Sequence, residues 1–530
     1  MRKFLLLFAI AILSSWQAFS KPVVTITGDL TTSTTWTNDN IYLLSGFVYV
    51  KDGITITIQP GTLIKGEKDS KGTLIVERGG KLNADGTAYD PIVFTSNEAP
   101  GSRNYGDWGG IILCGKATVN LPGGEAVVEG GTGATFGGAT SPDDNDNSGI
   151  LRYVRIEFPG IPFQPNQEIN GLTCAGVGRG TTIDYVMVAY SGDDSYEFFG
   201  GTVNAKHLVA FRSWDDDFDT DNGFSGNVQF GVSLRDPAIA DQSKSNGFES
   251  DNDGSGSTAT PSTKAVFSNM SIFGPQVDAS TTINSNFKAG AHLRRNTQER
   301  IYNSIIAGFP SGLLVDASLT ETNATNNDLQ FRNNIIAGCA TNLSVVTGST
   351  FDISNWFNTS SFGNTTLANN SELGINNPFN LSNPNFLPQT SSPANSGADF
   401  SNANLSSGFE VVTFKGAFGT TNWTSSWANW DPQSSAYTGI NEASNNVTLA
   451  RTYPNPTNGE TSMDLNLKER SNVSVTLTDV TGKTVSNLFN GKLAQGDNKI
   501  TFDLSGTAEG LYLVKVVANG SVKTMKLSVK

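Results

Sequence analysis

The chain is poor in cysteine and histidine. Its 530 residues contain two histidines, His207 and His292, and three cysteines that are far apart and form no CxxC pair: Cys114, Cys174 and Cys339. Disulfide frameworks and thiolate metal sites need several cysteines at set spacings, so we expect neither, and predict buried, unpaired thiols. The two histidines match no zinc-ligand or metalloprotease spacing, which predicts packed or surface side chains.

Basic residues and long apolar segments are also scarce. The chain has 35 Lys and Arg against 49 Asp and Glu, and its isoelectric point is about 4.7. Because nucleic-acid binding requires a basic face, this charge balance argues against that class of partner. No apolar run after residue 20 is long enough to span a bilayer, so we expect no transmembrane anchor in the mature chain.

Residues 1–20 have the pattern of a secretory signal peptide. Two basic residues precede an apolar run at 4–13, and Ala18 and Ser20 supply small side chains at the spacing that signal peptidase reads. We expect cleavage before Lys21. No cysteine follows the cleavage site to carry a lipid, so the pattern predicts export rather than anchoring.

Short strands separated by Gly, Pro and Asn dominate the next 400 or so residues. Strand segments that start at 183, 205 and 228 can be aligned at offsets of 22 and 23 residues, which is close to one coil of a parallel β-helix. Later, Ile272, Ile306 and Ile336 align, as do asparagines at 269, 303 and 333. This pattern predicts an isoleucine core stack and an asparagine hydrogen-bond ladder between coils. The register is imperfect at Leu208 and Val209, which cannot both face inward.

We therefore predict an all-β chain whose body, residues 21–432, is a right-handed parallel β-helix. Its last part, from about 395 to 432, contains Trp423, Trp427 and Trp430. An open solenoid end exposes unpaired backbone groups, so we interpret this part as a cap over that end; a platform on which sugars stack is the alternative.

The end of the chain has a different pattern. Residues 433–446 read as a linker, and residues 447–530 contain about seven alternating short strands with tight turns. Such a pattern is typical of a small antiparallel β-sandwich.

Acidic residues gather between positions 192 and 254. This stretch has 13 acidic and four basic side chains, so it carries −9 of the chain's net charge of −14. Carboxylates at this density repel one another unless a cation or solvent separates them. Calcium takes about six to eight hard oxygen ligands, which predicts a calcium site among Asp193, Asp194, Glu197, Asp215, Asp216, Asp217, Asp219 and Asp221. The alternative is that Asp, Asn and Gly only fill turns, because they tolerate left-handed backbone conformations.

Three motifs at the end of the chain resemble a known export signal. YPNPTNG at 453–459, VTLTDVTGKTV at 475–485 and GLYLVKVVANG at 510–520 are followed by a terminal KLSVK. In order and spacing they are similar to the C-terminal sorting domain of type IX secretion cargo. The resemblance implies that residues 447–530 are read by an outer-membrane translocon and are usually removed on export, with the cargo released or attached to surface lipopolysaccharide.

The body is similar to secreted parallel β-helix cargo proteins. Within it, DDDFDTDNG followed by SNGFESDNDG resembles two acidic coils of family nine pectate lyases. In those lyases an Asp-rich loop holds calcium, and a lysine directly after the NGF-type motif abstracts the proton next to the substrate carboxylate. Here Glu249 follows that motif instead, which puts the lyase activity in doubt. Glu249 and Lys244 remain the candidate catalytic residues.

These features predict a secreted or cell-surface protein that holds calcium and either binds glycans or has a structural role. The type IX translocon is the expected partner, and an extracellular polysaccharide is the expected ligand. The alternative function is a calcium-dependent polysaccharide lyase or glycoside hydrolase. The two differ in one feature, a catalytic base or acid pair beside the calcium loops.

Overall fold

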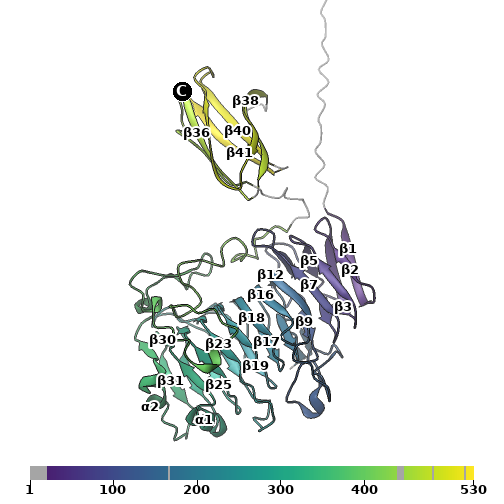
Figure 1. The fold of residues 1–530 in the computed structure, drawn as a ribbon, viewed down its shortest axis with the longest axis vertical. Coiled ribbons are helices and arrows are strands. Elements are labelled where there is room, and N and C mark those ends of the chain that lie inside the picture. Colours follow the sequence, from purple (N-terminus) through teal and green to yellow (C-terminus); the bar gives the residue numbers. More distant parts are fainter. Residues whose placement is uncertain (1–20, 165–166, 438–446, 469, 480–482, 519–520) are drawn as a thin grey trace, which may run out of the picture. The chain divides into compact units, whose positions relative to one another are not determined.

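The computed structural model divides the chain into two compact units (Figure 1). It describes residues 21–530 except 165–166, 438–446, 469, 480–482 and 519–520. One unit, the body, runs from Pro22 to Tyr437, and the other contains the described residues after position 446. The predicted signal peptide and most of the predicted linker lie outside the described residues.

The 28 strands of the solenoid form one continuous sheet that folds into three faces, here called sheets 1 to 3, because each coil of the chain adds a strand to each face in turn. Sheet 1 begins where β1 (Val23–Leu30) pairs with β3 (Ile41–Val50). It continues through β6 (Thr73–Val76), β9 (Gly110–Cys114), β15 (Leu172–Ala175), β17 (Tyr196–Phe199), β19 (Phe218–Asp221), β22 (Phe248–Ser250), β25 (Ala289–Leu293), β28 (Ser311–Val315) and β31 (Thr341–Val345).

Sheets 2 and 3 share the long strands β12 (Gly149–Glu157), β16 (Thr182–Ala189) and β18 (Asn204–Phe211), which run through a corner of the coil. The other strands of sheet 2 are β2 (Thr34–Trp36), β4 (Thr55–Ile58), β7 (Lys81–Asp85), β20 (Asn227–Gln229), β23 (Val266–Ser268), β26 (Arg300–Tyr302) and β29 (Gln330–Arg332). Sheet 3 begins with the first halves of β1 and β3, since β3 pairs with β5 as well as with β6. Its other strands are β5 (Leu63–Gly66), β8 (Ile92–Ser96), β21 (Val232–Leu234), β24 (Ser271–Phe273), β27 (Ile305–Ala307), β30 (Ile335–Ala337) and β32 (Thr365–Leu367).

Every strand pair within these three sheets is parallel, which confirms the predicted parallel β-helix. In Figure 1 the colours advance in sequence order along the stack, from β1 to β31. The remaining elements of the body are short: β10 (Ala126–Val127), β11 (Thr135–Phe136), β13 (Pro162–Gln164), β14 (Gln167–Glu168), β33 (Ile375–Asn377), β34 (Asn385–Pro388), α1 (Ser318–Thr325) and α2 (Ile353–Phe357), besides five 3₁₀ turns. No helix in the described part of the chain is both long and apolar enough to cross a membrane.

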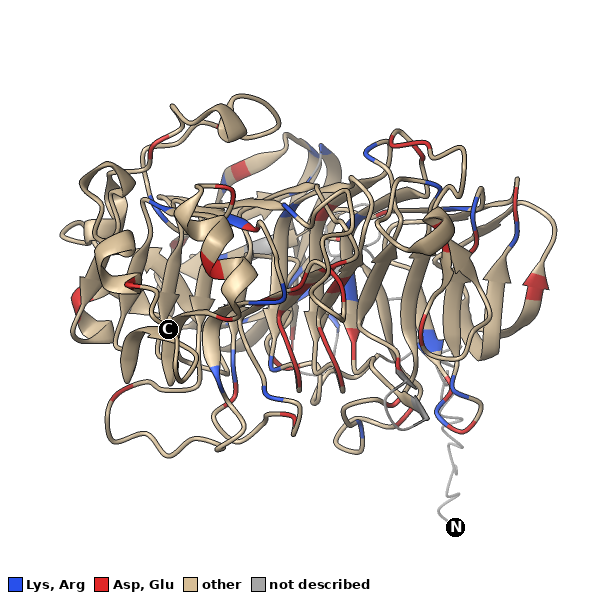
Figure 2. Cartoon of the chain, turned by 90° about the horizontal axis from the view of Figure 1, so that it is seen from below, with Lys and Arg blue, Asp and Glu red and all other residues tan. Residues whose placement is uncertain are grey.

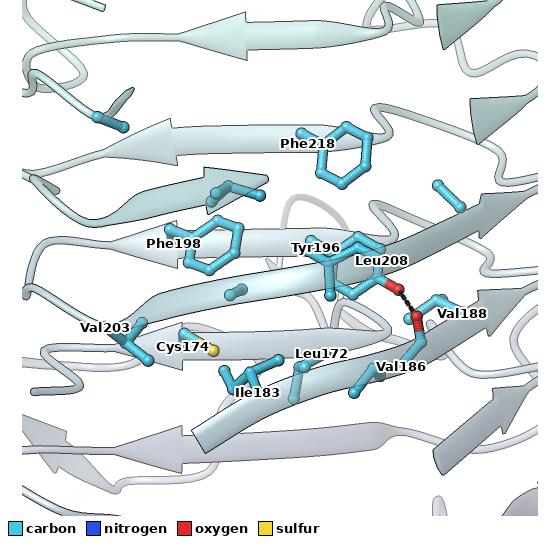
Figure 3. Packing of buried hydrophobic residues seen from close by; sticks show 14 of the residues in the cluster. Leu172, Cys174, Ile183, Val186, Val188, Tyr196, Phe198, Val203, Leu208 and Phe218 are labelled. Atoms are coloured by element: carbon cyan, nitrogen blue, oxygen red, sulfur yellow. Dashed lines mark hydrogen bonds between the residues drawn. The ribbon is translucent and has the colours of Figure 1, made fainter. Parts of the chain in front are cut away.

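Apolar side chains stack inside the three sheets at equivalent positions of successive coils. Ile272, Ile306 and Ile336 are paired in register and fully buried, as predicted. In the middle coils the stack becomes aromatic, and the rings of Tyr196 and Phe218 lie 5.3 Å apart and nearly parallel. Figure 3 shows this packing; the hydroxyl of Tyr196 donates to the backbone oxygen of Val186 at 2.7 Å, so the buried polar group is satisfied.

The corner between sheets 2 and 3 explains the irregular register at Leu208 and Val209. One residue per coil adopts a left-handed conformation there, such as His207 with φ 51°. Leu208 then points into the core between the sheets, whereas Val209 points outward. Both side chains are fully buried, because a later segment of the chain covers the outer face of sheet 3.

The predicted asparagine ladder lies at this same corner, but its bonds differ from the prediction. Asn269, Asn303 and Asn333 all have left-handed backbones and stack in register. The amide groups of Asn269 and Asn303 donate to the backbone oxygens of Phe414 and Asp399, at 2.8 and 3.3 Å. Asn269 and Asn303 thus hold the covering segment, and their bonds to neighbouring coils run through Gln229 and Ser268 rather than directly from one asparagine to the next.

That covering segment, residues 395–437, is called the strap. It returns along the flank of the solenoid, and its far end binds early coils, where the hydroxyl of Tyr437 donates to Oε1 of Glu157 at 2.6 Å. Trp427 is fully buried against the rings of Tyr153 and Tyr185, and Trp423 and Trp430 pack beside it. The segment predicted as a cap over the solenoid end is therefore a strap along its side. The reason is that corner residues with left-handed backbones, Tyr153 and Tyr185, turn their stacked rings outward and form an aromatic surface for the strap.

The C-terminal unit is a two-sheet antiparallel β-sandwich, as predicted. Its two sheets have the strand orders β35-β36-β39 and β38-β37-β40-β41, and apolar side chains fill the space between them. Its strands are β35 (Val447–Tyr453), β36 (Glu460–Leu467), β37 (Ser471–Asp479), β38 (Thr484–Leu493), β39 (Gly496–Asp503), β40 (Gly510–Ala518) and β41 (Ser521–Val529).

Candidate functional site

A row of acidic side chains crosses the outer face of sheet 1. The strand register pairs Glu197 of β17 with Asp219 of β19, then Asp219 with Glu249 of β22, and Glu249 with His292 of β25. Adjacent strands lie about 4.8 Å apart, so these side chains stack directly above one another. The residues that alternate with them along each strand point into the apolar core.

A second row occupies the turn before these strands. Asn170, Asp194, Asp216 and Asn246 hold equivalent positions, and each side-chain oxygen accepts the backbone N–H of the next coil. The N···O distance is 2.7 Å from Asp216 to Asp194, and 3.1 Å from Ala289 to Asn246. The ladder requires an acceptor at every position, which Asp supplies as well as Asn. It therefore fixes two carboxylates beside the first row.

The two rows bring three groups of carboxylates together. Within each group, one oxygen of each residue lies within 4.8 Å of the others, and the groups are Asp193–Asp194–Asp215, Asp194–Glu197–Asp219 and Asp216–Asp219–Glu249. We call these seven residues the acidic cluster. Figure 2 shows acidic segments of neighbouring coils side by side in the middle of the stack.

Among the described residues, no Lys or Arg forms an ion pair with Asp194, Glu197 or Asp219 at the centre of the acidic cluster. Burial raises the pKa of Asp194, Glu197 and Asp219 well above the usual values of carboxyl groups, and neighbouring carboxylates raise them further. Burial also raises the pKa of Asp215, to about 6. Oε1 of Glu197, a residue only 4% exposed, and Oδ1 of Asp219 are buried without a hydrogen-bond partner among the described residues. Either protons or a cation must supply the missing positive charge.

Two of the eight predicted calcium ligands lie outside this cluster. Asp217 is fully buried, and its Oδ1 forms an ion pair with Arg235 at 3.0 Å. Because Asp217 turns to the other side of the chain from Asp216, it belongs to a structural ion pair. Asp221 lies two residues beyond Asp219 on β19, where burial and the charge of Asp251 raise its pKa to about 8. The other six predicted ligands are brought together.

Basic side chains border the cluster on the coil of β25. Glu249 forms an ion pair with Arg294, and its Oε1 lies 3.3 Å from Nδ1 of His292. Arg294 also donates from Nε to Asp251 at 2.8 Å. The charge of Glu249 is thus compensated, whereas the charges of the cluster's central residues are not.

Two lysines lie close to the cluster in sequence or in space. Nζ of Lys244, the predicted candidate, donates to Oδ1 of Asn286 at 3.1 Å. Nζ of Lys288 instead lies 3.3 Å from Nε2 of His292, which is 3.0 Å from Oδ2 of Asp316. Burial lowers the pKa of Lys288. His292 is 1% exposed, so of the two predicted states, packed or at the surface, it is packed, and its partners are charged groups of this site.

Sequence reasoning missed Lys288, Arg294 and Glu129. Glu129 comes from the loop before β11, where its Oε1 accepts the side-chain N–H of Asn170 at 3.0 Å. No repeat signal marks that loop. Aligning AGAHLRR with NGFESDN places Arg294 at the position of Asp251 in the next coil. This alignment could have predicted from the sequence that Arg294 lies beside the acidic cluster.

Two family models match the chain. One, described as a pectate-lyase-like β-helix domain, matches residues 28–377, which is more than half of the chain. The other, described as a secretion system C-terminal sorting domain, matches residues 451–530. No curated protein matches the chain.

Proposed function

The chain belongs to the family of proteins with a pectate-lyase-like β-helix domain, and from this premise we propose that its body holds calcium and binds glycans outside the cell. Its C-terminal sorting domain, of the type IX kind, directs export to the cell surface or the extracellular medium and interacts with the secretion system. The family leaves the ligand open, so the residues of the acidic cluster carry the proposal.

The observation that supports calcium most directly is the group Asp194–Glu197–Asp219. Three carboxylates converge there from neighbouring coils, with two buried oxygens that have no partner among the described residues. The nearest arginines are taken up by Asp217 and by the pair Glu249 and Asp251. Hard carboxylate oxygens are the ligands that calcium prefers, and backbone oxygens and waters can complete its shell of about six to eight ligands.

Calorimetric titration of the mature protein with calcium tests this site. Asp219 belongs to two of the three groups, so Asp219→Asn should weaken calcium binding at least tenfold. The matched control is Asp221→Asn, which changes an acid on the same strand outside the groups and should leave the affinity unchanged. Extracellular calcium modules bind at about 10⁻⁴–10⁻³ M, which sets the protein concentration needed. Absence of binding to the native protein, or equal effects of both variants, would contradict the proposal.

Glycan binding is supported by the position of the acidic cluster. The cluster's strand residues lie on the outer face of sheet 1, since the residues that alternate with them point into the core, and carboxylates and a bound cation both bind sugar hydroxyl groups. A glycan array, probed with the mature protein in calcium and then in chelator, should give signals that chelation abolishes. Signals that chelation leaves unchanged would separate glycan binding from the acidic cluster.

A polysaccharide lyase is the second candidate, and Lys288 is the residue that favours it. Proton abstraction next to a uronate carboxylate needs a neutral base, and burial lowers the pKa of this lysine beside the cluster. The glycosidase alternative finds less support, because Glu249 is held by Arg294. Formation of unsaturated uronides by the native protein, lost in Lys288→Ala, would establish the lyase.

A further inference from the structure

Four parts of the chain line a pocket beside the last coils of the body, near β30 and β31 in Figure 1. Residues 276–279 and 338–340 lie between a strand of sheet 3 and the next strand of sheet 1, and residues 368–371 follow β32. Ile375, Pro378 and Phe379 complete the wall. The cavity has a volume of about 520 Å³, and sites for small organic molecules have volumes of about 300–1,000 Å³. The pocket is therefore large enough for such a ligand, and it shares no residue with the acidic cluster.

The walls of this pocket are joined by the side chain of Asn370. Its Nδ2 donates to the backbone oxygens of Gln276 and Val277, both at 2.8 Å, which ties two of the lining segments together. Its Oδ1 lies against Gly338, a residue with a left-handed backbone (φ 56°), where an added Cβ would overlap that oxygen. The pocket is therefore preformed, and little ordering of the protein is needed when a ligand binds.

The lining is mostly apolar and contains one charged side chain. Val277, Ala279, Ala340, Ala368, Ile375, Pro378 and Phe379 supply the apolar surface. Asp278 is the one charged residue among the described residues that line the pocket. Its Oδ1 accepts the hydroxyl of Ser280 at 2.6 Å and the backbone N–H of Ser280 at 2.8 Å, and these bonds lower the pKa of Asp278. The pocket thus combines apolar walls with an ionised carboxylate at neutral pH.

No described Lys, Arg or His forms an ion pair with Asp278. All its printed side-chain hydrogen bonds use Oδ1, so Oδ2 is available to a ligand. An anionic ligand would be repelled there, whereas a protonated amine would make a charge-assisted hydrogen bond. Because Asp278 is exposed, solvent screens this bond, and its effect on affinity is about two- to fivefold. The apolar walls must supply the larger part of the binding free energy.

We propose that this pocket binds a small organic amine, with the apolar part of the ligand between Val277 and Phe379 and its protonated nitrogen against Oδ2 of Asp278. The site is independent of the proposed calcium and glycan binding. The charge complementarity sets the ligand class, and the volume limits the ligand to a small molecule.

The pocket contains its own reporter of occupancy. Cys339 lines it and is half-buried, whereas Cys114 and Cys174 are buried. N-ethylmaleimide should therefore alkylate the native mature protein at Cys339, and Cys339→Ser should remove the reaction. Three probes of matched size differ in charge: phenethylamine is a cation, 2-phenylethanol is neutral and phenylacetate is an anion. Phenethylamine should slow the alkylation at a concentration about two- to fivefold lower than 2-phenylethanol, and phenylacetate should be the weakest.

One substitution separates the charge from the shape of the pocket. Asp278→Asn keeps an oxygen for the turn at Ser280, and it should reduce the effect of phenethylamine to that of 2-phenylethanol without changing the latter. The matched control is Asp399→Asn, because Asp399 is also exposed and its Oδ1 accepts the backbone N–H of Ser401 at 2.8 Å. The control should alter neither probe.

Saturation-transfer NMR, which does not depend on the thiol, should rank the three probes in the same order. Equal binding of all three, or a preference for the amine that survives Asp278→Asn, would overturn the ligand class. Absence of both protection and saturation transfer with every probe would overturn the site.

Discussion

Calcium should raise the melting temperature of the mature protein near neutral pH and have little effect in acid. The acidic cluster is the reason, because its carboxyl groups have pKa values raised by burial and by one another. At low pH protons neutralise these groups. At higher pH a cation is needed, and a ligand that binds only the native state stabilises that state.

The size of the shift follows from general values. A ligand at about 100 times its Kd stabilises the native state by about 2.7 kcal/mol. Unfolding entropy of about 2.1 cal/mol/K per residue amounts to about 0.8 kcal/mol/K for a body of roughly 400 residues. The expected rise in melting temperature is therefore about 3 °C.

The pH dependence follows from the direction of the pKa shifts. Without calcium, the cluster's carboxyl groups stabilise the folded state only when they are protonated, because their pKa values are raised by folding. This stability is present below about pH 4 and is lost as pH rises through the pKa of the folded state, which is about 6 for Asp215. Calcium binds the ionised groups, so its stabilisation should develop over the same pH range. Differential scanning fluorimetry at about pH 4 and pH 8, with calcium and with chelator, measures both effects.

Two variants make the reasoning falsifiable. Asp216→Ala combined with Asp219→Ala removes members of all but one group and should abolish most of the calcium-dependent shift. Asp221→Asn should leave it unchanged. An equal shift at both pH values, or no response to chelator at pH 8, would refute the calcium site.

Four further predictions follow from other parts of the molecule. Intact-mass measurement of exported protein should show loss of residues 1 to about 20 and of the sorting domain after roughly residue 446; a cell-associated cytoplasmic product that retains Met1 would contradict this. The native protein should not cleave polygalacturonate by β-elimination, because Glu249 occupies the position of the catalytic base of the lyases. The absorbance of unsaturated uronides, measured for the native protein and for Glu249→Lys, checks this. Product formed by the native protein would establish lyase activity. Trp427→Ala should cost about 3–5 kcal/mol of folding free energy, because a fully buried indole of the strap is removed. If the strap tryptophans are structural, glycan binding should not change. Denaturant unfolding measures the first effect and the glycan array the second. Burial raises the pKa of Glu299 inside the solenoid, so the stability that its protonated form contributes is lost as pH rises above about 4.5. Glu299→Gln should therefore become more stable relative to the native protein with increasing pH. If denaturant unfolding shows the same pH dependence for both proteins, Glu299 does not control the pH dependence of stability.

The repeated core could be predicted from the sequence because its determinants recur at the coil period. Ile272, Ile306 and Ile336 occupy one position of successive coils, and the same reasoning places Asp219 above Glu197 at an offset of 22. Side chains at equivalent positions must stack in a parallel solenoid. Six of the eight predicted ligands came together for this reason.

The remaining features depend on contacts that no period reveals. Asp215, Asp216 and Asp217 are adjacent in the sequence, yet the backbone turns Asp217 toward Arg235, a partner that only the fold brings close. The strap tryptophans pack on left-handed corner residues of earlier coils. The offset from Glu249 to its register partner His292 is 43 residues, because loops intervene between the two coils. Long-range pairing of this kind is set by tertiary structure.

The net charge of −9 in residues 192–254 is therefore unevenly distributed over the coils. At β22, Arg294 binds both Glu249 and Asp251, so the carboxylates nearest the later coils are compensated. At β17 and β19, Glu197 and Asp219 keep oxygens without partners among the described residues. A cation gains most where negative charge is uncompensated and desolvated. The electrostatics thus favour calcium between β17 and β19 rather than at the NGF-containing coil of β22, whose carboxylates Glu249 and Asp251 are already paired with Arg294.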